Sequence, residues 1–109
     1  MNMYWKLFID AKSLKNTEVV FNRVINILSV KFTNLTIEPY HKGGFTCSFL
    51  TSNNSDQWSE TVINSLSLAQ KIGRDWILLE NIRIELNAWS NKPSIPGVQN
   101  IQLIVESNT

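Results

Sequence analysis

Few residues of this chain have the types and spacing that catalysis requires. His41 is the only histidine, in the run 40–44 (Tyr-His-Lys-Gly-Gly), and Cys47 is the only cysteine. A general base works with a second catalytic group within hydrogen-bond reach, and no such partner is evident, so we interpret His41 as an exposed turn residue. Cys47 alternates with Phe45 and Phe49, which predicts a small apolar core residue and not a nucleophile.

Other patterns that carry chemistry are missing from the sequence. No phosphate-binding glycine loop, nucleophile elbow or dinucleotide motif is present. One histidine and one cysteine exclude the zinc sites that are built from several such ligands. Glu80 and Glu85 have opposite parity on one predicted strand, so their carboxylates do not converge as an acid and a base. We therefore expect a protein that is not an enzyme, with no catalytic residue, no metal and no cofactor.

The most informative pattern is an unbroken alternation of apolar and polar residues in Ile82-Arg83-Ile84-Glu85-Leu86-Asn87-Ala88-Trp89. Side chains of a strand point to opposite faces with a period of two, so this segment predicts a sheet that is covered on one face and open on the other. Trp89 falls on the predicted open face. A large aromatic side chain at such a position indicates a surface that binds something.

The rest of the chain supplies the elements that position this strand. Apolar residues alternate in 4–10, 35–38, 45–49 and 101–106, and they recur at helical spacing in 20–28 and 58–69. Asn16 or Thr17 is the expected cap of the first helix, which should end near Lys31. Gly43-Gly44 predicts a hairpin turn, and 53–56 should open the second helix. We predict one long strand over 76–89.

The order is strand, helix, strand, strand, helix, strand, with one extra strand at the C-terminus. This order predicts an α+β fold, the ferredoxin-like split β-α-β two-layer sandwich, in which two helices cover one face of an antiparallel sheet. The 109 residues, 43% hydrophobic and 17% charged, fit a single domain over 1–109. A signal segment and an apolar run of about 20 residues are both missing, so we expect a cytoplasmic protein without membrane contact.

The alternate residues, collected strand by strand, give a predicted open face. It holds four carboxylates against two cations and is therefore net −2 on a chain of net charge +1: Asp10, Glu38, Glu85 and Glu106 against Lys6 and Arg83. Phe8, Tyr40, Trp89 and Ile104 add aromatic and apolar surface. Such a composition is typical of a protein-binding patch. The predicted partner-binding residues are Glu38, Tyr40, His41, Glu85, Asn87, Trp89, Asn91 and Lys92.

Two alternatives to this patch stay open. In the first, the face is a solvated sheet surface whose aromatic side chains form cross-strand pairs. In the second, the protein binds its partner through the loops at 40–42 and 91–92.

A small chain with an acidic, aromatic-bearing surface and no catalytic equipment resembles the immunity proteins of bacterial contact-dependent growth inhibition systems. The resemblance rests on size, strand–helix order and composition. It implies a stoichiometric inhibitor, a monomer or weak dimer, that binds and neutralises one cognate toxin domain, often a nuclease. Nuclease toxins tend to be basic because they bind phosphate, and an acidic face suits such a partner.

RNA binding is an alternative function because the split arrangement is also that of the RNA-recognition domain. Segments 7–9 and 42–49 are similar to its two sheet motifs. However, Gly44 and Thr46 occupy the positions whose aromatic rings should stack on bases, and an acidic face repels phosphate. A small dimeric ligand-binding domain that uses the sheet face as its own interface is a third alternative.

Overall fold

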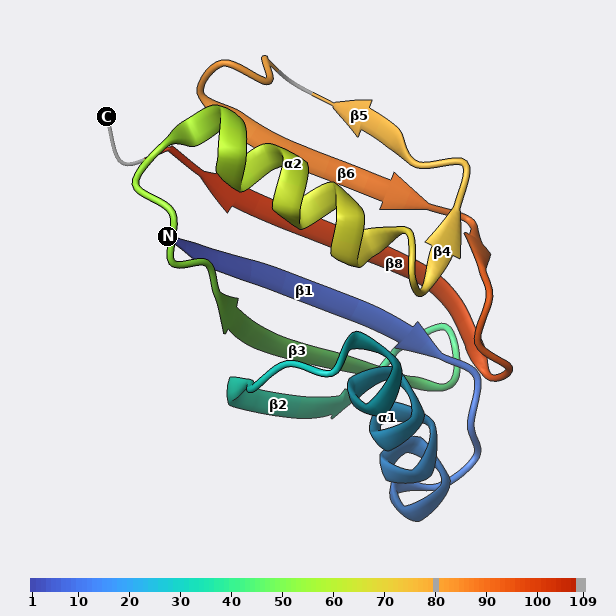
Figure 1. The fold of residues 1–109 in the computed structure, drawn as a ribbon. Helices are drawn as coiled ribbons and strands as arrows, with labels where there is room; N and C mark the ends of the chain where they lie inside the picture. The colour runs from blue at the N-terminus through green and yellow to red at the C-terminus, as the bar shows by residue number, and fades with distance from the viewer. Residues whose placement is uncertain (80, 108–109) are drawn as a thin grey trace.

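A six-stranded antiparallel sheet forms the frame of the protein in the computed structural model, which describes residues 1–79 and 81–107 (Figure 1). The strand order is β2-β3-β1-β8-β6-β5. The strands are β1 (Asn2–Ile9), β2 (Thr33–Pro39), β3 (Phe45–Ser52), β5 (Ile77–Leu79), β6 (Glu85–Ser90) and β8 (Val98–Glu106). A separate ribbon pairs β4 (Gly73–Arg74) with β7 (Lys92–Pro93). The helices are α1 (Leu14–Leu28) and α2 (Trp58–Ala69).

The predicted α+β class, with two helices and an antiparallel sheet, is confirmed for the described residues. Both helices lie on the same side of the sheet (Figure 1). The ring of Phe21 in α1 is centred 5.3 Å from that of Phe49 in β3. On α2, the Ser65 hydroxyl contacts the sulfur of Met3 in β1 at 3.1 Å. Met3 and Phe49 point to the same face of the sheet because they share the parity of Trp5, which pairs with Phe49.

The prediction of one long strand over 76–89 is wrong. The segment forms two strands, β5 and β6, which pair with each other so that Leu78 lies opposite Ala88. The chain reverses at Asn81, whose backbone carbonyl accepts hydrogen bonds from the amides of Ile84 and Glu85 and whose side-chain oxygen accepts one from the Arg83 amide. Asparagine side chains favour such turns because they bond to the backbone two residues further on.

The alternation of apolar and polar residues is therefore a strand pattern only from Glu85 onward. Ile82 and Ile84 are 41% and 63% exposed in the turn, and Arg83 lies in that turn and not on the sheet. The prediction of an appended C-terminal strand is also wrong, because β8 pairs with β1 on one side and β6 on the other. Beyond β8 the sheet continues with β6 and ends with the edge strand β5.

Both helices begin elsewhere than predicted. The N-terminal cap of α1 is Ser13, whose hydroxyl oxygen accepts a hydrogen bond from the Asn16 amide at 3.1 Å. The helix ends at Leu28, three residues before Lys31, and Ser29 follows it in a left-handed conformation (φ 54°). α2 begins at Trp58 without a side-chain cap. Its positions 61, 65 and 69 face the sheet at the spacing of one helical turn, so Ile63 points outward.

The covered face of the sheet holds the core. Trp5 is 0% exposed, stacks on Phe49 with parallel rings 6.2 Å apart, and donates its indole N–H to the Thr51 hydroxyl at 2.9 Å. Cys47 is fully buried as predicted, and this burial raises the pKa of its thiol from 9.0 to about 11. On the other face, no helix of residues 1–79 and 81–107 lies over the half-buried side chains of Tyr4, Lys6 and Phe8. We call this side of the sheet the open face.

Candidate partner-binding surface

Three aromatic side chains from distant parts of the chain meet on the open face. Phe8 of β1 lies between Tyr40, which follows β2, and Trp89 of β6. The ring centroids are 5.3 Å apart for Phe8 and Tyr40 and 5.7 Å for Phe8 and Trp89, and both pairs are in edge-to-face geometry. The ring of His41 lies 4.5 Å from that of Tyr40. We call Phe8, Tyr40 and Trp89 the aromatic cluster.

A tight hairpin holds Tyr40 against the end of β1. The Tyr40 amide donates to the Gly44 carbonyl and the Gly43 amide to the Tyr40 carbonyl, both at 2.9 Å. Gly43 and Gly44 have φ values of 98° and 76°, which favour glycine. A side chain at Gly44 would collide with the carbonyl oxygen of Ile9. The close approach of these two backbones brings Tyr40 beside Phe8.

Trp89 reaches Phe8 across the intervening strand β8. Trp89 lies opposite Gln102, whereas Phe8 lies opposite Asn100, two residues away on the same strand. The indole N–H of Trp89 donates to the side-chain oxygen of Asn91 at 2.6 Å. This bond fixes the plane of the indole, so Asn91 positions Trp89 in addition to offering its own amide to solvent.

A hollow of about 330 Å³ opens beside the aromatic cluster. Besides the three rings it is lined by Lys42, Gly43, Gln99 and Asn100. The ammonium group of Lys6 lies 5.4 Å from the centroid of the Phe8 ring. The sequence pattern does not place Gln99 and Asn100 in a strand, because it predicts that the last strand begins at 101, whereas the strand begins at Val98. With the correct start, the parity of β8 assigns Asn100 to the open face.

The carboxylates predicted on the open face are not spread evenly around the aromatic cluster. Glu38 is exposed on the edge strand β2, opposite Thr46, which in turn lies opposite Phe8. Glu85 begins β6, four residues before Trp89, and lies opposite Glu106 of β8. The open face is therefore not evenly acidic. Lysines flank the aromatic cluster, and two glutamates occupy the opposite end of the sheet.

The last two predicted contact residues make bonds within the protein. The side-chain oxygen of Asn87 accepts a long hydrogen bond of 3.4 Å from the amide of Gln102 on β8. The ammonium group of Lys92 forms an exposed ion pair with Asp75 at 2.8 Å, beside the pairing of β4 with β7. The hydrogen bond from Lys92 lowers the pKa of the Asp75 carboxyl. Lys92 is thus engaged in a surface pair and stands apart from the aromatic cluster.

No family model, curated protein sequence or solved structure matches this chain.

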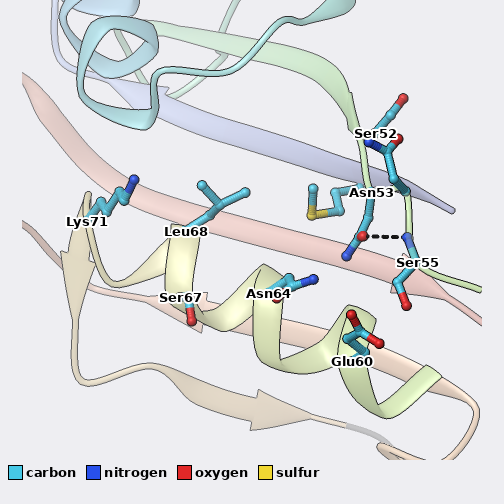
Figure 2. A pocket seen from close by; sticks show the side chains of 10 residues that line it. Ser52, Asn53, Ser55, Glu60, Asn64, Ser67, Leu68 and Lys71 are labelled. Carbon is cyan, nitrogen blue, oxygen red and sulfur yellow. Dashed lines mark hydrogen bonds between the residues drawn. The ribbon is translucent and has the colours of Figure 1, made fainter. Parts of the chain in front are cut away.

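Another hollow, of about 560 Å³, lies on the covered side along α2 (Figure 2). Figure 2 shows Glu60 and Lys71 at opposite ends of this hollow, so the two charges do not converge on one point. The side-chain oxygen of Asn53 accepts the Ser55 amide at 2.9 Å, and its side-chain nitrogen is a buried donor without a partner in the described structure. Because that nitrogen is inaccessible from the hollow, it does not mark a ligand position.

Two further observations describe what the surface of residues 1–79 and 81–107 offers. These residues contain no group of three His, Cys, Asp or Glu side chains that could hold a metal ion. Neither α1 nor α2 is long and apolar enough to cross a membrane. The aromatic cluster is bordered by the amide side chains of Gln99 and Asn100 and by Lys42.

Proposed function

We propose that this chain is a stoichiometric protein inhibitor, an immunity protein that binds and neutralises a bacterial toxin domain through the open face. The observation that carries the proposal is the aromatic cluster on a sheet surface that no helix covers. Tyrosine and tryptophan dominate binding hot spots because they bury a large area at little cost in conformational entropy. The inhibitor has no catalytic role in this proposal.

The aromatic cluster is organised before any partner arrives. Phe8 is fixed between two rings, and Asn91 satisfies the indole N–H of Trp89. Binding therefore requires little ordering of these side chains, and the entropy cost of about 0.5–1.5 kcal/mol for each immobilised side chain is reduced. Preorganisation of this kind suits a protein that must stay tightly bound to its target.

We infer that the fold is the ferredoxin-like split arrangement extended at one edge. The order β2-β3-β1-β8 and its antiparallel pairing support this inference, because β1 lies between β3 and β8 and the hairpin partner β2 lies outside β3. β6 and β5 then continue the sheet beyond β8. The extension contributes Trp89, so the added strands complete the aromatic cluster.

We propose that the toxin is a nuclease. The inhibitor would bind it in the cytoplasm, as a monomer or weak dimer. The strands of the open face carry Glu38, Glu85 and Glu106 against one cation, Lys6. An excess of two carboxylates favours a basic partner. Nucleic-acid enzymes present basic surfaces to phosphate, so this excess suits a nuclease better than an acidic toxin.

Co-expression with a candidate toxin domain, chosen from the genes that neighbour the gene of this chain, tests the proposal. We expect the two proteins to purify together at a ratio of one to one, and Phe8→Ala to weaken the complex in calorimetry. Ile63→Ala is the matched control, since Ile63 is 64% exposed on α2, away from the open face. If Phe8→Ala and Ile63→Ala both leave the affinity unchanged, the open face is not the interface.

Binding of single-stranded RNA is a second candidate, favoured by the position of Lys6 and Lys42 beside the rings. Aromatic rings stack on bases and lysines contact phosphate, so such a site would bind single strands with a strong dependence on salt. Titration of a fluorescent single-stranded RNA at low salt tests it. Affinity that falls steeply as salt rises would favour RNA over the toxin domain.

A further inference from the structure

We propose that the end of the open face opposite the aromatic cluster docks a basic segment of the protein partner. One arginine or lysine side chain of the partner lies between Glu85 and Glu106, and its aliphatic part packs on Tyr4, Leu50 and Ile104. The inference rests on the proposed function, because the partner is the same protein, and it names the chemistry of a second anchor that the aromatic cluster does not supply.

The first observation is a pair of like charges at opposite positions of the sheet. Glu85 and Glu106 are directly opposite each other on the antiparallel strands β6 and β8, and both point to the open face. Like charges in this position destabilise a sheet. Among the described residues, no cation lies within ion-pair distance of either carboxylate, and the ion pair that is present joins Lys92 to Asp75. A cation from another molecule would remove the repulsion.

The second observation is an apolar hollow beside this pair. It has a volume of about 410 Å³ and is lined by Asn2, Tyr4, Leu50, Ile104 and Glu106. Tyr4 lies opposite Leu50 on one side and Ile104 on the other, and its hydroxyl donates to Ser48 at 3.2 Å, which holds the ring in place. Methylene groups of a long basic side chain pack on such a floor while the charged end reaches the carboxylates.

The chemistry selects a basic protein segment over other cations and over nucleic acid. Two carboxylates on neighbouring strands are too few for Ca²⁺, which takes six to eight oxygen ligands. Phosphate groups are repelled by the same two charges. An arginine or lysine can form ion pairs with the two carboxylates while its methylene groups pack on the apolar floor. The face of the tyrosine ring attracts its positive charge as well.

The two ends of the open face can serve one interface. Trp89 follows Glu85 by four residues on β6, which separates their positions by about 13 Å at the rise of a strand. An interface of standard size buries about 800 Å² on each partner and spans this distance. One partner can therefore place an apolar residue at the aromatic cluster and a basic residue at the glutamate pair.

Titration of the full-length, ¹⁵N-labelled protein with a hexa-arginine peptide at low salt tests the inference. We expect the largest amide shifts at Tyr4, Leu50, Ile104 and Glu106, and binding at least tenfold weaker in the double variant Glu85→Gln/Glu106→Gln. The control Glu18→Gln/Glu60→Gln removes the same charge from the two helices and should bind the peptide as the unchanged protein does. Equal losses in both double variants, or shifts spread over all carboxylates, would overturn the inference.

Thermal unfolding of the same variants supplies a readout that needs no ligand. Because the two glutamates repel each other, Glu106→Gln should raise the melting temperature, whereas Glu60→Gln should not. A lower melting temperature in Glu106→Gln would contradict the repulsive pair and the docking argument built on it. Such a result would not affect the proposed function, because the binding of Phe8→Ala to the toxin domain tests that function separately.

Discussion

Two tryptophans on opposite sides of one sheet show the same side chain in the core and on the face that we propose for recognition. Trp5 and Trp89 both donate their indole N–H to a side-chain oxygen and both contact a phenylalanine ring. Trp5 is closed off by the helices, whereas Trp89 is half-buried on a face that no helix covers. Satisfied hydrogen bonds and aromatic contacts therefore do not distinguish a core residue from a binding residue, and the covering layer does.

The largest expected effect is loss of stability on removal of the covered tryptophan. Trp5→Ala removes a fully buried ring stacked on Phe49 and should lower the free energy of unfolding by about 3–5 kcal/mol. Trp89→Ala should lower it by about 1 kcal/mol, because much of that side chain already meets water. Urea unfolding of the two variants measures the difference. Equal losses would show that the open face is part of the folded core.

The covered side also predicts a dependence of stability on alkaline pH. Burial raises the pKa of Cys47 from 9.0 in the unfolded chain to about 11 in the folded protein. The unfolded chain loses this proton first, so stability is complete below pH 9 and falls by about 3 kcal/mol as the pH rises through 11. The difference in unfolding free energy between the protein and Cys47→Ala, measured from pH 8 to 11, isolates this group. Parallel curves would contradict the burial of the thiol.

Affinity for the toxin domain should reverse the order of the two tryptophans. Trp89→Ala should weaken binding by about 2 kcal/mol or more, as hot-spot residues do. A milder change at the covered site, Trp5→Phe, should leave the affinity of the folded protein unchanged. Calorimetry with both variants, after their folding has been verified, compares the two sides of the sheet directly. Loss of affinity in Trp5→Phe alone would assign recognition to the helix side.

The smallest effect is expected at Asn91, one of the two acceptors of the indole N–H groups. Thr51→Val leaves the buried N–H of Trp5 unpaired and should cost about 1–3 kcal/mol of stability. Asn91→Ala exposes the N–H of Trp89 to water, which replaces the lost bond, so the cost should be within about 0.5 kcal/mol. Thermal unfolding of the two variants measures both. A large loss in Asn91→Ala would mean that the loop after β6 is held by this bond.

The sequence predicts the strands well where one face is apolar and the other polar. The alternation in 4–10 and 45–49 identifies β1 and β3 and assigns Phe8 to the open face, since Trp5, Leu7 and Cys47 all point into the core. The same alternation misleads at 82–84, because the side chain of Asn81 bonds to the backbone and turns the chain. A period of two does not distinguish a strand from a turn that happens to alternate.

The candidate site is only partly visible in the sequence for a related reason. Tyr40 and Trp89 approach Phe8 from β2 and β6, which are separated by three strands in the sheet. Their meeting depends on strand order, and strand order is set by long-range pairing that no local pattern contains. The same register places Glu85 opposite Glu106 and four residues before Trp89, so these two carboxylates of the predicted open face lie away from the aromatic cluster.

The contact between Gly44 and the Ile9 carbonyl has a consequence for how this surface can vary. The backbone of the hairpin is anchored at Gly44, whereas the exposed side chains of His41 and Lys42 project beyond it. Substitutions at 41 and 42 can therefore diversify the rim while the rings behind it keep their places. If this surface is selected for a new target, in nature or in a library, positions 41 and 42 can change while the hairpin backbone stays the same.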